Sequence, residues 1–232
     1  MAEVTGESYP VYIGPDTLVW WKESGLPTVP LRDKGGATLF SFVKEEFPEI
    51  ARFPGRNPWE GGVVHRLDTP TSGLVLIARD ERALSSLLQQ QRDGLLRKEY
   101  IAHSSKGRAV EEGFPSYPFK SPERGEVIES HFRAFGPGRK SVRPVLPGKR
   151  AEGPLYSTSV SPEGELSFRC TLSRGFRHQI RCHLAWAGYP VLGDTLYGGE
   201  ASDVFGLEAV SITYIEPSTG KERTVSVQPR TL

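Results

Sequence analysis

The feature that most constrains this chain is a continuous aliphatic run entered through a glycine-flanked polar turn. Residues 61–80 read GGVVHRLDTPTSGLVLIARD, and the run GLVLIA at 73–78 is typical of a buried central strand. One carboxylate, Asp68, precedes the tight TPTSG turn, which also carries Thr71 and Ser72. An Asp at a strand entrance can be a plain turn former. A carboxylate fixed at the edge of a cleft is also a candidate nucleophile or general base.

The remaining pattern predicts an α+β fold with a mixed, largely antiparallel central sheet and flanking helices and loops. Apolar spacing and cap residues predict three helices, within residues 37–50, 80–94 and 176–188. Thr38 is the expected N-cap of the first, and Asp80 and Gly94 are the expected ends of the second. Strands are expected at 11–21 (two, around a turn), 73–78, 95–102, 128–135, 155–160, 165–172 and 207–227 (a hairpin). The strands outnumber the helices, and many pair with sequence neighbours.

Composition indicates an ordinary globular protein of 232 residues, with 37% hydrophobic and 25% charged residues. We expect a single domain, 1–232, with its core at about 11–227. The start, MAEVTGESYP, has no basic or apolar segment of a signal peptide, and no stretch is long enough for a membrane span. Two cysteines are too few for a disulfide framework and fit a reducing compartment, so we expect a cytoplasmic protein.

Positive charge is concentrated in one segment although the net charge is only +1. Residues 133–150 hold six basic residues, no acid and six Gly or Pro residues, so a loop or arm is expected there. Arg139, Lys140 and Arg143 in this segment are candidate phosphate contacts. A solvated surface loop is an equally good interpretation.

A second cluster lies in residues 173–199, where Arg174, Arg177, His178 and Arg181 crowd the start of a predicted helix. Such a cluster can bind phosphate, and Arg181 can instead pair with a buried carboxylate and hold it ionised. The alternative is a solvated basic face on an amphipathic helix.

No metal or cofactor site is predicted. Cys170, His178, Cys182 and His183 lie close in sequence, but none of the familiar zinc spacings is present. The chain also lacks a P-loop or dinucleotide fingerprint.

Three segments together resemble the RluA-type family of RNA pseudouridine synthases. HRLDTPTSG, residues 65–73, is similar to the family's catalytic motif, with Asp68 at the nucleophile's position. Tyr100 in KEYIA stands where the family carries its active-site tyrosine. HQIRCHLAWAGYPVLGDTLYG, residues 178–198, is similar to a third family block, with Arg181 at the basic residue that pairs with the catalytic aspartate.

The resemblance covers residues 11–227 and departs from the family pattern at a few positions. Trp21-Lys22-Glu23 replaces the usual Asn-Lys-Pro, Gly175-Phe176-Arg177 replaces Gly-Arg-Thr, and Leu207-Glu208-Ala209 replaces Leu-His-Ala. We expect no separate N-terminal RNA-binding domain of the small kind that many members of this family carry.

The resemblance implies an isomerase that converts uridines of structured ribosomal or transfer RNA to pseudouridine without a cofactor. It implies that Asp68, Tyr100 and Arg181 converge on one pocket as catalytic residues. Contacts to RNA are expected from His65, Arg66, Thr71, Ser72, Arg177, His178, Gln179, Arg139, Lys140 and Arg143. His65 is either a base-flipping wedge or a packed structural histidine. We expect a monomer with RNA as its partner and no membrane contact.

Two other classes of function stay open at this point. One is a catalytically silent RNA-binding or assembly module, against which an intact Asp68, Tyr100 and Arg181 argue. The other is an Asp-dependent glycoside hydrolase, which usually needs a second carboxylate about 5–9 Å from the first. No second acid stands out near these motifs.

Overall fold

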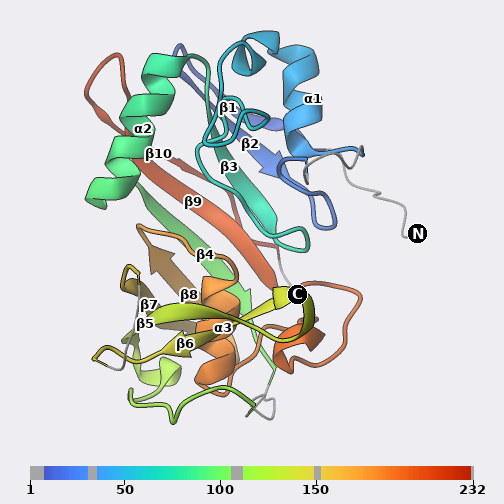
Figure 1. Ribbon diagram of the computed structural model, residues 1–232, viewed down its shortest axis with the longest axis vertical. Coiled ribbons are helices and arrows are strands. Elements are labelled where there is room, and N and C mark those ends of the chain that lie inside the picture. Colours follow the sequence, from blue (N-terminus) through green and yellow to red (C-terminus); the bar gives the residue numbers. More distant parts are fainter. Residues whose placement is uncertain (1–7, 31–35, 106–111, 149–152, 231–232) are drawn as a thin grey trace. The chain divides into compact units, whose positions relative to one another are not determined.

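The computed structural model describes residues 8–30, 36–105, 112–148 and 153–230. The chain divides into two compact units (Figure 1). The first unit comprises Met1–Lys98 and Ala209–Gln228, and the second comprises Glu99–Glu208 and Pro229–Leu232. In the described part of the chain, no helix is both long and apolar enough to cross a membrane.

The first unit is built on strands in the order β1-β2-β3-β9, with β10 paired to β9. Pairs β1–β2, β2–β3 and β9–β10 are antiparallel, and Thr17 lies opposite Ala78 in the β2–β3 register. The elements are β1 (Pro10–Ile13), β2 (Thr17–Lys22), α1 (Leu39–Glu46), the 3-10 turn η1 (Pro48–Ala51), β3 (Ser72–Ala78), α2 (Glu81–Asp93), β9 (Leu207–Ile215) and β10 (Glu222–Ser226).

Both helices of this unit begin at their predicted N-cap residues, and α2 also ends at its predicted glycine. Thr38 accepts from the Ser41 amide and Ser41 reciprocates, which forms a capping box at α1. Asp80 accepts from the Ala83 amide, and Gly94 ends α2 in the left-handed conformation. These ends are therefore determined locally.

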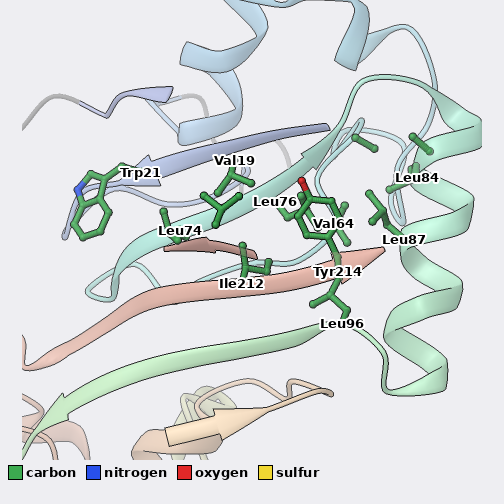
Figure 2. Close-up of a cluster of buried hydrophobic side chains, with 13 residues drawn as sticks. Val19, Trp21, Val64, Leu74, Leu76, Leu84, Leu87, Leu96, Ile212 and Tyr214 are labelled. Atoms are coloured by element: carbon green, nitrogen blue, oxygen red, sulfur yellow. The ribbon is translucent and has the colours of Figure 1, made fainter. Parts of the chain in front are cut away.

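One core cluster of the first unit lies between this sheet and α2. Figure 2 shows Leu84 and Leu87 of α2 directed toward the strands, with Leu74 and Leu76 of β3 in the same cluster. All seven residues of β3 are buried, so the aliphatic run forms a central strand as predicted. The polar turn lies directly before β3 in the chain.

The second unit has the strand order β4-β8-β7-β5-β6, and pairs β5–β6, β5–β7 and β7–β8 are antiparallel. Its elements are β4 (Arg97–His103), which begins in the first unit, η2 (Pro122–Arg124), β5 (Glu126–Phe135), η3 (Pro137–Arg139), β6 (Ser141–Val145), β7 (Tyr156–Gly164), β8 (Ser167–Leu172), α3 (Gln179–Trp186) and η4 (Thr195–Tyr197). Strands outnumber helices, many pair with sequence neighbours, and the predicted α+β class is confirmed.

Every residue of α3 is buried. The helix packs against β6 and β7 of its own unit (Figure 1), and Cys182 and Ala185 form a core cluster with Val142 and Tyr197. The interpretation of this segment as a solvated basic face is therefore wrong for the helix itself.

The prediction of a loop at residues 133–150 is also wrong for residues 133–135 and 141–145, which lie in strands. Residues 133–135 end β5, residues 141–145 form β6, and Arg133 lies opposite Arg143 in the hairpin. Lys149 and Arg150 lie outside the described residues. Pro144 signalled a loop, but β6 is the last strand of the order, and an edge strand tolerates a residue that donates no ladder hydrogen bond.

Candidate active site

Asp68 lies on a short turn immediately before β3. The preceding segment joins the sheet through the Val64 amide, which donates to the Leu76 carbonyl over 3.1 Å, and the turn is closed by the Thr71 amide donating to the Asp68 carbonyl over 3.0 Å. Asp68 is partly exposed, whereas Thr71 and Ser72 after it are buried. A partly exposed acid therefore lies at the entrance of a buried strand.

Glycine is required where this turn enters the sheet. Gly73 has φ +122°, and a Cβ there would lie 2.3 Å from the Ala209 carbonyl oxygen. A Cβ on Gly62 would lie 1.9 Å from the carbonyl oxygen of Ala78. Backbone therefore approaches too closely for any side chain at either position, as the motif's glycines predicted.

The segment that follows β2 holds the Asp68 turn from both sides. Before Asp68, the Thr28 hydroxyl donates to the Leu67 carbonyl over 3.0 Å and accepts from the Leu67 amide over 3.1 Å. After Asp68, the Gly25 amide donates to the Thr69 carbonyl over 2.9 Å. We call residues 22–28 the clamp segment, because these hydrogen bonds fix the backbone on both sides of the acid.

Ser24 and Lys22 complete this clamp segment. The Ser24 hydroxyl donates to the Pro70 carbonyl over 2.6 Å. The Lys22 ammonium has no exposed surface and donates to the carbonyls of Glu23, Leu26 and Thr69 over 2.9, 2.7 and 3.2 Å. Burial lowers the pKa of Lys22 to about 7, against the opposing charges of Asp68 and Glu23. A buried cation thus lies near the candidate nucleophile.

We predict that Lys22→Met lowers the free energy of unfolding by about 2–3 kcal/mol, because three backbone carbonyls lose a charged donor. Urea denaturation followed by circular dichroism measures the change. Lys221→Met, at an exposed lysine, is the matched control and should leave stability within about 0.5 kcal/mol. A Lys22→Met protein as stable as wild type would show that the ammonium does not hold this turn.

His65 is a packed structural residue rather than a wedge. It is 5% exposed, and its Nε2 accepts from the Leu76 amide over 3.2 Å. Burial is the main cause that lowers its pKa well below 6.5, so the ring is neutral. The side chain of Arg66, by contrast, is 61% exposed. It pairs with buried Glu60 over 3.0 Å, and it remains a candidate RNA contact.

Lys98, in the part of β4 that belongs to the first unit, is a second buried lysine. Burial first, and then the charge of Arg56, lower its pKa from 10.5 to about 7. The unfolded chain keeps this proton up to about pH 10, so unfolding takes up a proton between pH 7 and 10. Stability should therefore rise with pH across that window, and the full cost of burying the cation is present below pH 7.

We predict that Lys98→Met is more stable than wild type at pH 6–7 and that this advantage shrinks as the pH approaches 10. Urea denaturation of both proteins at pH 6, 7, 8, 9 and 10 measures the difference. Lys120→Met, at an exposed position, controls for loss of a surface charge and should show a flat difference. A gap for Lys98→Met that stays constant with pH would contradict the lowered pKa.

The second unit carries the other two predicted catalytic residues. Tyr100 lies on β4 and is 6% exposed. Arg181 lies on α3, is 5% exposed, and makes a two-pronged pair with Asp194: Nε to Oδ2 is 2.6 Å and Nη2 to Oδ1 is 2.9 Å. The guanidinium also lies over the rings of Tyr197 and Phe205, at 5.2 and 5.3 Å from their centroids. Arg181 therefore has a buried carboxylate partner within its own unit.

Two of the RNA contacts predicted in the second unit are internal instead, and so are Thr71 and Ser72 in the first, which are 2% and 5% exposed. Arg143 is 3% exposed; its Nε donates to the Glu112 carbonyl over 2.8 Å, and its guanidinium lies 4.3 Å from the Phe135 ring centroid. Gln179 is also 3% exposed and donates to the Ser157 carbonyl over 3.0 Å. Both side chains are buried within the second unit, because four successive residues of β6 and every residue of α3 are covered by other parts of the chain.

The remaining predicted contacts are exposed or lie next to an exposed residue. Arg139 and Lys140 are exposed at the hairpin turn, and Arg177 is exposed before α3. Arg177 Nη2 donates to the carbonyl of Arg139 over 2.6 Å. His178 is partly buried, with Nδ1 3.1 Å from the Tyr197 hydroxyl. These residues form a basic surface on the second unit.

Sequence reasoning missed Lys22 and Asp194. Lys22 was noted only as part of a departure from the family pattern, although a lysine that directly follows the apolar run LVWW is a signal for a buried amine. Asp194 lies in the stretch GDTLYG. From sequence alone, an acid in such a stretch is interpreted as a turn former, and its burial is not predicted.

Comparison with known proteins identifies the family to which this chain is similar. The profile of the RNA pseudouridylate synthase family matches residues 16–186. An uncharacterized RNA pseudouridine synthase of Chloroflexus aurantiacus is 31% identical over 205 residues, which cover 86% of this chain and 59% of that protein. The dual-specificity RNA pseudouridine synthase RluA of Vibrio parahaemolyticus is 28% identical over 216 residues, covering 89% of this chain and 77% of the relative.

The fold is similar to that of a solved structure, human RNA pseudouridylate synthase domain containing 1. The TM-score is 0.63 at 21% identity, over 96% of this chain and 84% of the other. The family profile spans the clamp segment, the Asp68 turn, Tyr100 and Arg181 alike. On this evidence the chain belongs to the RluA-type family of RNA pseudouridylate synthases.

Proposed function

We propose that this protein is an RNA pseudouridine synthase that isomerises uridines in structured ribosomal or transfer RNA. The observation that carries the proposal is Asp68: a partly exposed acid on a turn braced from both sides, in a segment that resembles the family's catalytic motif and lies within the residues that the family profile matches. We further propose that the whole chain acts as one catalytic domain, as a monomer in the cytoplasm.

The proposed reaction breaks the N1–C1′ glycosidic bond of a uridine and forms a C5–C1′ bond. The hydrogen on C5 leaves as a proton and N1 gains a proton, so the product is an isomer and no oxidant or energy source is consumed. Asp68 is the proposed nucleophile, attacking either the uracil ring or the sugar. Tyr100 is proposed to hold the detached uracil or to move a proton, and Arg181 to keep the acid charged.

The target base must leave its stack before this chemistry, which costs a few kcal/mol. Contacts between basic side chains and phosphates offset that cost. Arg66, Arg139, Lys140 and Arg177 are proposed to supply such contacts, because all four are exposed.

Tritium release tests the proposed function. RNA transcribed with [5-³H]uridine, from both ribosomal and transfer RNA genes, is incubated with the purified protein. We expect tritium in the solvent with the RNA strand intact, and carbodiimide mapping should locate the modified sites. Release of free uracil would instead identify a glycoside hydrolase, and RNA binding without either product would identify a silent binding module.

A further inference from the structure

The second unit presents a stack of aromatic rings that ends at its surface. Phe132 on β5 lies between two rings: the His183 ring centroid is 5.0 Å away at an interplanar angle of 29°, and the Phe176 centroid is 5.0 Å away at 4°. The ring of Tyr156 on β7 packs against that of Phe176, with centroids 5.1 Å apart. His183 is fully buried, whereas Phe176 is 36% exposed. Phe176 is therefore the outermost ring of the stack.

The inner end of this stack is rigid. His183 Nε2 is 2.9 Å from the Ser130 hydroxyl and Nδ1 is 2.9 Å from the Thr158 hydroxyl. Burial lowers the pKa of His183 to about 3, so the ring stays neutral. Both ring nitrogens are occupied, which fixes the ring plane on which Phe132 rests.

Gln179 fixes the outer end. Its Oε1 accepts from the Phe176 amide over 3.0 Å, and its Nε2 donates to the Ser157 carbonyl and the Thr158 hydroxyl over 3.0 and 2.9 Å. A buried side chain thus holds the backbone of an exposed phenylalanine in place. Such an ordered ring loses little conformational entropy when a ligand binds.

The exposed ring lies between two cations in the sequence Arg174-Gly175-Phe176-Arg177, and all four residues are exposed. The Arg177 guanidinium is anchored on the carbonyls of Arg139 and Ser141, over 2.6 and 3.1 Å. An exposed flat ring flanked by arginines has the chemistry of a single-stranded RNA contact, in which a base stacks and neighbouring phosphates pair with cations.

We propose that Phe176 is a stacking platform for an unpaired nucleobase of the RNA, with Arg174 and Arg177 at the adjacent phosphates. The inference rests on the proposed function for the identity of its ligand as RNA. The competing explanation is that Phe176 only covers Phe132. Phe176→Leu distinguishes these two explanations, because leucine keeps an apolar cover over Phe132 but has no aromatic face.

The probe is a 12-nucleotide single-stranded RNA with 2-aminopurine at its centre. Wild type should quench the 2-aminopurine emission on binding, because stacking on a ring quenches that base. Phe176→Leu and Phe176→Ala should weaken binding by about 5- to 150-fold, the range for losing one stacked base, and should lose the quenching. Phe176→Trp should keep both.

Phe42→Ala is the matched control, because Phe42 is an equally exposed phenylalanine (41%) on α1 of the other unit; it should bind and quench as wild type does. Thermal unfolding of Phe176→Leu checks that the unit is intact. Wild-type affinity and quenching in Phe176→Leu would overturn the platform, as would wild type that fails to bind the probe.

Tritium release, measured on the same proteins, separates this inference from the proposed function. If wild type releases tritium while Phe176→Leu binds the probe unchanged, the platform is wrong and the function stands. If wild type quenches the probe through Phe176 but releases no tritium, the function is wrong and the platform stands.

Discussion

Asp68→Asn is expected to reduce the rate of tritium release from [5-³H]uridine RNA by at least about 10⁴-fold, the scale of losing a nucleophile or its essential partner. The amide has the shape of the carboxylate but lacks its charge and its nucleophilic oxygen. Single-turnover assays with enzyme in excess measure the effect on chemistry alone.

The Asp68→Asn protein should keep the backbone of the turn. The hydrogen bonds of the clamp segment run to the backbone of Leu67, Thr69 and Pro70, and asparagine keeps all of them. RNA affinity should also stay close to that of wild type, because binding and chemistry use different groups.

Asp80→Asn provides the matched control for this substitution. Asp80 follows β3 at its other end, caps α2, and is exposed. Asparagine is an equally good N-cap, so stability and tritium release should both stay near wild type. Asp68→Asn activity within tenfold of wild type would rule out Asp68 as the nucleophile.

Asp194→Ala is expected to lower the free energy of unfolding by about 3–5 kcal/mol, the usual cost of removing one partner of a buried ion pair. Asp194 is 2% exposed, and both of its carboxylate oxygens bond the Arg181 guanidinium. Its removal leaves a buried cation without this carboxylate. Chemical denaturation measures the loss.

A double substitution distinguishes a lost pair from a lost residue. Arg181→Met combined with Asp194→Leu removes both charges and keeps the apolar volume, so it should recover most of the stability that Asp194→Ala loses. Asp203→Ala, at an exposed acid of the same unit, should change stability by less than about 0.5 kcal/mol. A loss below about 1 kcal/mol for Asp194→Ala would show that this pair does not stabilise the unit.

Local chemistry allowed the sequence to predict the ends of α2 and the position of β3. Asp80 and Gly94 determine helix ends by their own hydrogen bonds and φ angles, and neither needs a distant partner. The same holds for the glycines of the motif. Such features are readable because their cause lies within a few residues.

Other features depend on long-range packing and were not readable. α3 begins at Gln179 rather than earlier, because His178 adopts φ +59°, outside the helical region. The β6 strand exists because it pairs with β5, which no local propensity of a Gly- and Pro-rich segment indicates. The neighbours of Arg143 and Gln179 are likewise set by the tertiary fold, which buries residues that polarity alone would place at the surface.

The convergence of Asp68, Tyr100 and Arg181 on one pocket remains a prediction from the family resemblance. Within the second unit the arginine has Asp194 as a partner, and nothing in the sequence pointed to that acid. Sequence motifs therefore identified candidate residues well and identified their supporting residues poorly.

The clamp segment determines how much of this chain would have to be transferred to build the same site in another protein. The nine residues HRLDTPTSG do not by themselves define where the acid sits, since four residues some forty positions earlier hold the turn's carbonyls and amide. A graft of the nine-residue peptide onto a foreign scaffold would thus place a loose, unsupported carboxylate. The smallest portable unit is the antiparallel β2–β3 pair together with both loops that extend from it.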